Sequence, residues 1–98
     1  MINAIEARKL TQQGFEKHQE YVEKYLSDNK DKFTKVIEQA ASWGRTHAYL
    51  PVEIPASEDF IFLTRNIIDK FFTRAGFKFE KIERNGSIIK TIIINWEE

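Results

Sequence analysis

The sequence predicts one α+β domain whose elements follow in the order α, α, β, α, β, β. Three observations predict this order. Apolar residues recur at helical spacing in three segments, an alternating segment follows the second of these, and an Asn-Gly pair separates two strand-like runs near the C-terminus. A chain of 98 residues is the usual size of a single domain. We therefore expect residues 1–98 to form a small antiparallel sheet that packs against helices.

The first helix is expected to cover most of residues 1–28. Asn3 can accept a hydrogen bond from a free backbone N–H, and Glu6 can reach back, as in an N-terminal capping box. The apolar stripe of this helix is weak, because Gly14 and His18 stand where a core would favour larger apolar residues. A helix of about 24 residues is about 36 Å long at 1.5 Å per residue, so it crosses the domain or overhangs it. We expect it to pack along the sheet, with self-association as the alternative.

The second helix and the first strand follow directly. Five apolar residues share one face of the second helix: Phe33, Val36, Ile37, Ala40 and Ala41. Gly44 is placed to end that helix in a left-handed conformation. Residues 46–54 then alternate, which predicts a strand with Ala48, Leu50, Val52 and Ile54 toward the core. Because Pro51 has no N–H to donate, this strand should lie at an edge of the sheet or break there.

The third helix is predicted to open at Pro55 and Ser57 and to end at Gly76. Glu58 and Asp59 would then occupy its first turn, where acidic side chains interact favourably with the helix dipole. Its apolar face is the widest of the three, and it includes Phe60, Ile61, Leu63, Ile67, Ile68, Phe71, Phe72 and Ala75. We expect this helix to be the central one.

The C-terminal segment predicts a hairpin, with Asn85 and Gly86 as its tight turn because both residues tolerate positive φ. The last strand, about residues 87–96, is apolar on both faces. Ile89 and Ile93 lie on one face, opposite three other isoleucines on the second. A strand with one solvated face would alternate more cleanly, so we expect a second cover. The first helix is the expected lid, and another chain is the alternative.

Composition excludes several classes of function. Fifteen basic and fifteen acidic residues give a formal net charge of zero, which disfavours nucleic-acid binding and an amphipathic membrane anchor. The absence of cysteine excludes disulfides, thiolate catalysis and cysteine-based zinc sites. No apolar run is long enough to span a bilayer, and the N-terminus does not resemble a signal peptide. These features suit a soluble protein of the cytoplasm.

No catalytic or metal-binding constellation is evident, so we expect no enzymatic activity, no metal and no cofactor. His18 has Gly14 and Val22 at helical i±4 spacing, and neither can ligate a metal. The chain carries no glycine-rich phosphate loop and no G-x-S-x-G motif. The carboxylate pair Glu58-Asp59 is typical of a helix start. Catalytic residues are therefore predicted to be absent.

The candidate binding residues are five polar or aromatic side chains near the second helix end and the C-terminus: Trp43, Arg45, His47, Tyr49 and Trp96. Aromatic anchors dominate interface energetics when they are exposed, and Arg45 with His47 could contact an anion. Structural roles for the two tryptophans, capping the core and sealing the sheet, are the alternative. The candidate interface residues are Tyr21 and Tyr25 on the first helix and Ile89 and Ile93 on the last strand.

In four segments the chain resembles a loose class of small, uncharacterised accessory proteins of bacteriophages. These are residues 7–11 (ARKLT), 37–44 (IEQAASWG), 75–79 (AGFKF) and 92–96 (IIINW). The resemblance implies context rather than chemistry. Small phage proteins of this kind include inhibitors of host proteins, anti-defence proteins and minor virion components, and none of the four segments carries a catalytic motif.

Three hypotheses follow for the function. The first is a non-catalytic protein that binds a host or phage protein, as an inhibitor or an anti-defence protein. The second is a structural or assembly component that forms a homo-oligomer through the first helix or the last strand. The third is a protein that sequesters a small ligand such as a nucleotide, with Arg45, His47 and Arg74 as anion contacts at a subunit boundary.

Overall fold

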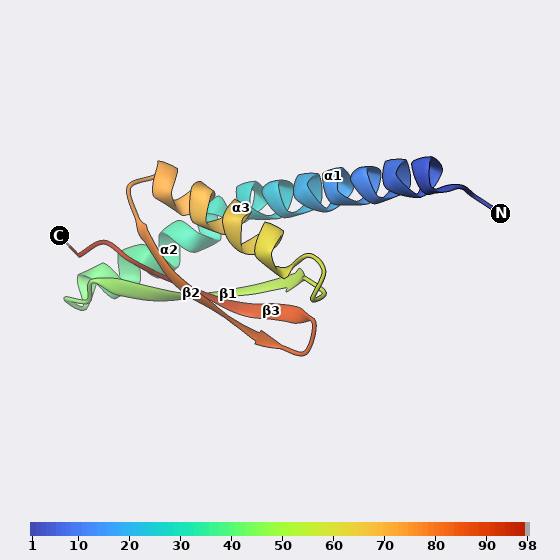
Figure 1. Ribbon diagram of the computed structural model, residues 1–98. Coiled ribbons are helices and arrows are strands. Elements are labelled where there is room, and N and C mark those ends of the chain that lie inside the picture. The colour runs from blue at the N-terminus through green and yellow to red at the C-terminus, as the bar shows by residue number, and fades with distance from the viewer. Residues whose placement is uncertain (98) are drawn as a thin grey trace.

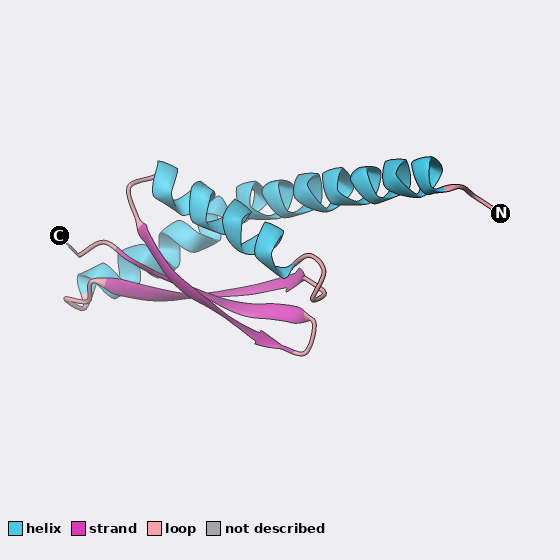
Figure 2. Ribbon diagram, viewed as in Figure 1, coloured by secondary structure: helices cyan, strands magenta, loops and turns pink. Residues whose placement is uncertain are grey.

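Three helices cover one face of a three-stranded antiparallel sheet (Figures 1 and 2). The computed structural model describes residues 1–97. Its elements are α1 (Ala4–Asp28), α2 (Lys30–Ser42), β1 (His47–Pro55), α3 (Ile61–Arg74), β2 (Lys78–Asn85) and β3 (Ile88–Asn95). The strand order is β1-β3-β2, so the C-terminal strand is the central one. The predicted class and the predicted order of elements are both confirmed.

The core lies between the sheet and the helices. As predicted, β1 buries Ala48, Leu50, Val52 and Ile54 and exposes the residues between them. It is an edge strand, which accommodates Pro51, and its register with β3 shifts between Pro51 and Ile54. The fully buried partners of these side chains include Val22, Leu26, Ile68, Ile89, Ile92 and Ile94.

Helix α1 begins with the predicted cap, because the backbone N–H of Glu6 donates to Asn3 Oδ1 at 2.9 Å. Only its C-terminal part is buried, through Val22 and Leu26. The N-terminal half extends beyond the sheet, so the molecule measures 59 Å along its longest axis and 26 and 23 Å across (Figure 1). Tyr21, a predicted interface residue, is exposed. It lies about 100° around the helix from Val22, outside the buried face.

Two predicted element boundaries are wrong, and both errors come from the sheet extending further than expected. Helix α3 begins at Ile61, because Pro55 still pairs with Ile88 and Ala56 N donates to Ser87 O at 2.7 Å. Glu58 and Asp59 therefore lie in a turn before the helix rather than in its first turn. In the hairpin, Asn85 pairs with Ile88, and the two-residue loop consists of Gly86 and Ser87. Of these two loop residues, Gly86 has positive φ, at 64°.

The expectation that α1 covers the second face of the last strand is also wrong. All three helices lie on one side of the sheet, and α1 packs against α3 (Figure 1). Ile89 is fully buried in the core on the helix side. Ile93 pairs with Tyr49 and Lys81 on the open face, yet it is only 3% exposed. Its neighbours on the edge strands shield it, since side chains opposite one another share a face.

Candidate functional site

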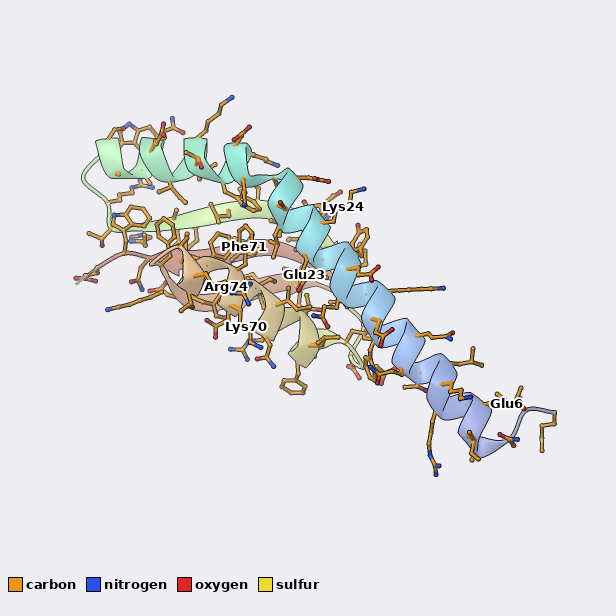
Figure 3. All side chains as sticks on the ribbon, turned by 90° about the horizontal axis from the view of Figure 1, so that it is seen from above. Glu6, Glu23, Lys24, Lys70, Phe71 and Arg74 are labelled. Atoms are coloured by element: carbon orange, nitrogen blue, oxygen red, sulfur yellow. The ribbon has the colours of Figure 1, made fainter. Side chains whose placement is uncertain are left out.

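The sheet order leaves a gap in the helical layer. Helix α2 packs against edge strand β1 and α3 packs against edge strand β2, so the two helices diverge above the central strand (Figure 3). The C-terminal half of α1 closes one end of this gap. The result is an open groove of about 850 Å³, lined by residues of all three helices and by Ala75 and Phe77. We call it the interhelical groove.

The floor of the interhelical groove is apolar and largely aromatic. It consists of Phe33 and Ile37 from α2, Ile67, Phe71 and Phe72 from α3, and Phe77. The rings of Phe33 and Phe72 lie 5.7 Å apart and connect the two walls. Phe71 packs edge-on against Phe72 at 5.0 Å and stays only partly buried. The aromatic surface that remains partly uncovered in the groove is therefore that of Phe71 and Phe77, because Phe33 and Phe72 are each only 2% exposed.

The rim of the interhelical groove is charged. Glu23 stands on α1, Lys30 at the start of α2, and Lys70 and Arg74 on α3. Lys30 Nζ lies 5.9 Å from the centroid of the Phe71 ring, at cation–π distance. Figure 3 shows Glu23 on the side of α1 that faces α3, whereas Lys24 lies on the opposite side. Within residues 1–97 the salt bridge is Lys90–Glu53, which lies away from this rim.

The sequence predicted the groove residues as core, and it did not predict a groove. The wide apolar face of the third helix could have indicated the groove. A helix over an edge strand cannot bury so wide a face against the sheet alone. Phe72 and Ile68 are buried in the core, Phe71 packs against the core but stays partly exposed, and Phe62 is 75% exposed.

The five predicted binding residues lie outside the interhelical groove. Trp43 is 63% exposed and stacks with Arg45, whose Cζ atom is 5.4 Å from the indole. His47 and the exposed Tyr49 pack against each other with ring centroids 5.5 Å apart. Trp96 is half-buried and its ring packs against Phe77, while its backbone N–H donates to the Thr46 carbonyl oxygen at 2.9 Å. Trp96 thus seals the end of the sheet, and Trp43 is the exposed aromatic residue of the pair.

Of the predicted interface residues, only Tyr21 remains free. The hydroxyl of Tyr25 accepts a hydrogen bond from the Glu53 backbone N–H at 2.9 Å, which ties α1 to β1. Ile89 and Ile93 are buried within the chain, so the prediction that they form an interface is wrong. A central strand buries both residues without help from a second molecule.

His18 has an internal polar partner. Its Nε2 atom lies 2.7 Å from Thr64 Oγ1, and its ring stacks on Phe60 with centroids 4.7 Å apart. Phe15 meets Phe60 edge-on at 5.2 Å, so these four residues form the joint between α1 and α3. Burial lowers the pKa of His18 below its ordinary value of 6.5. Among residues 1–97, no three His, Cys, Asp or Glu side chains gather where they could hold a metal ion.

None of the helices in the described part of the chain is both long and apolar enough to cross a membrane. The third hypothesis placed Arg45, His47 and Arg74 as anion contacts at a boundary between subunits, and it stays a prediction. Arg74 lines the interhelical groove, whereas Arg45 and His47 contact the rings of Trp43 and Tyr49. In comparisons with known proteins, no family model, curated protein or solved structure matches this chain.

Proposed function

We propose that this chain is a non-catalytic protein-binding domain that takes an amphipathic helix of a partner protein into the interhelical groove. The supporting observation is the aromatic floor between α2 and α3, with the partly uncovered Phe71 at its centre. Concave apolar surface with a polar rim is typical of sites that bind a helix through its apolar face. The resemblance to phage accessory proteins suggests a host or phage protein as the partner, met in the host cytoplasm.

A helix fits this groove better than an extended peptide does. A strand needs an exposed sheet edge to satisfy its backbone N–H and C=O groups. The groove walls are helices, whose main-chain groups are already hydrogen-bonded within each helix except at the ends. An extended segment would bury unpaired backbone groups there, at a cost of about 1–3 kcal/mol each. A helix carries its own backbone hydrogen bonds and presents only side chains.

The proposal is tested by selection from a displayed library of helical peptides. The wild-type chain should enrich peptides with apolar residues at i, i+3, i+4 and i+7 spacing. Phe71→Asp should lose these peptides, because a carboxylate would replace the aromatic floor. The matched control is Phe62→Asp on the outer face of the same helix, which should bind as the wild type does. Absence of enrichment, or equal binding by Phe71→Asp with its fold intact by circular dichroism, would refute the groove as the site.

Self-association is a second candidate function, supported by the overhanging half of α1. The N-terminal turns of α1 extend beyond the sheet, and Ile5 and Leu10 on these turns are exposed. Apolar side chains on an unsupported helix favour pairing with a second helix. Light scattering over a range of concentrations tests this candidate. A dimer that Ile5→Lys with Leu10→Lys converts to a monomer would support it, and a monomer at all concentrations would exclude it.

A further inference from the structure

We infer that the partner helix is acidic, with carboxylates flanking its apolar stripe on the side that meets α3. This inference rests on the proposed function and specifies the chemistry of the occupant. The observation that supports it is the net positive charge of the side chains at the rim of the groove.

The rim cations gather around Phe71. Lys70 and Arg74 are four residues apart on α3, so they stand on the same side of that helix. Lys30 approaches the Phe71 ring from α2, at 5.9 Å. A helix lying on Phe71 would therefore meet positive charge from both walls. Carboxylates spaced three or four residues apart on the partner would match the spacing of Lys70 and Arg74.

Within residues 1–97, the positive charge of the rim is not compensated by salt bridges. The groove is lined by three cations, Lys30, Lys70 and Arg74, and by one carboxylate, Glu23, so its net charge is 3 − 1 = +2. None of these four side chains makes a salt bridge in the described residues 1–97. The chain as a whole is neutral. The groove thus departs from the charge balance of the molecule, and complementary charge on a partner gives specificity and speeds association.

This charge argues against α1 of a second copy as the occupant. The segment of α1 before its joint with α3, residues 4–13, carries Glu6 against Arg8 and Lys9, a net charge of 2 − 1 = +1. Two positively charged surfaces repel one another, and juxtaposed like charges suppress the wrong partner. Self-association through α1 would therefore use a surface other than the interhelical groove.

The test uses two synthetic helical peptides of about 18 residues, roughly 27 Å long at 1.5 Å per residue. Both carry the same leucine stripe, and they differ only in flanking glutamates or flanking lysines. Fluorescence anisotropy measures binding of each labelled peptide. At low ionic strength the glutamate peptide should bind about tenfold more tightly, as expected from two or three partly exposed ion pairs. The preference should shrink in high salt because exposed charges are screened.

Charge reversal on the rim provides the decisive comparison. Lys70→Glu combined with Arg74→Glu should reverse the preference in favour of the lysine peptide. The control, Lys78→Glu combined with Lys81→Glu on β2, makes the same change in net charge outside the groove and should leave the preference unchanged. Both pairs are at exposed positions, so the fold should survive in each variant.

The outcomes distinguish failure of the helix-binding groove from failure of the acidic partner. If both peptides bind equally and Phe71→Asp abolishes both, the helix groove stands and the acidic partner is wrong. If neither peptide binds, the proposed function fails, and the inference with it. Dodecyl sulfate below its micelle concentration is a further arm. Phe71-dependent binding of this amphiphile without binding of either peptide would assign the groove to a lipid-like anion and overturn the inference.

Discussion

The Nε2 atom of His18 on α1 lies 2.7 Å from the hydroxyl oxygen of Thr64, a fully buried residue on α3. The same hydroxyl donates its only hydrogen to the Phe60 carbonyl, also at 2.7 Å. Since that hydrogen is committed, His18 must be the donor, which fixes the neutral imidazole as the Nε2–H tautomer. This one hydrogen bond joins the overhanging helix to α3 within an otherwise aromatic contact.

Removing the hydroxyl should weaken this joint. Thr64→Val keeps the shape of the side chain but leaves the part-buried His18 N–H without its acceptor. We expect a loss of about 1–2 kcal/mol in the free energy of unfolding, measured by urea denaturation. Thr73→Val is the matched control on the same helix, because Thr73 makes an exposed bond to Asp69. A loss at position 64 no larger than at position 73 would show that the bond to His18 is not stabilising.

Acid should destabilise the fold through the same histidine. Burial lowers the pKa of His18 in the folded state, so the unfolded chain binds more protons below its ordinary pKa of 6.5. The stability that the neutral ring contributes is complete above about pH 6.5. It should decline as the pH falls from there toward the lowered pKa of the folded state.

Urea midpoints measured between pH 7.5 and pH 5 test this dependence. His18→Gln keeps an N–H donor and cannot titrate, so it should flatten the curve in this interval. His47→Gln removes the other imidazole of the chain and serves as the control. An unchanged slope in His18→Gln would contradict the assignment to His18.

The two tryptophans should report opposite environments. Trp43 is exposed beside Arg45, whereas Trp96 is half-buried against Phe77. Iodide should therefore quench Trp43 far more than Trp96. Trp43→Phe should remove most of the quenchable emission, and Trp96→Phe should leave it in place. Equal quenching of the two single-tryptophan variants would contradict the difference in exposure between Trp43 and Trp96.

The sequence predicted correctly those elements whose local residue pattern agrees with their packing in the fold. The alternation of β1 holds because each inward residue meets the core, and Asn3 caps α1 because its side chain needs only the adjacent backbone. The predictions failed where pairing between residues far apart in the sequence determines the structure. Pro55 was predicted to open a helix, but its pairing with Ile88 keeps it in the sheet. Spacing along the chain carries no information on that partner.

The groove lay outside sequence reasoning for the same reason. Phe33 and Phe71 belong to separate helices, and each looks like an ordinary core position on its own helix. Phe33 is buried at 2% exposure, whereas Phe71 stays partly exposed because α2 and α3 diverge above the strand order β1-β3-β2. Likewise, the apolar character of Ile93 suggested a second cover. Its central position between Tyr49 and Lys81 is what buries it.

Two glycines should respond in opposite directions to the same substitution. Gly14 lies inside α1, and a Cβ added there would meet no atom within 4 Å. Gly14→Ala should therefore stabilise the helix by up to about 1 kcal/mol, since alanine loses less conformational entropy than glycine on folding. Gly86 has equally open space, but its φ is +64°. Gly86→Ala should destabilise the hairpin by about 1–2 kcal/mol, because a Cβ crowds the backbone in that region.

Thermal and urea unfolding of both variants separate the two effects. Since both sites have room for a Cβ, a change in stability of opposite sign at the two sites would identify backbone conformation as the cause. The change at Gly14 also tests how α1 is coupled to the rest of the fold. If the overhanging half frays independently, Gly14→Ala should raise helical content by circular dichroism without moving the global unfolding midpoint. If the midpoint rises as well, α1 unfolds together with the domain through its contact with α3.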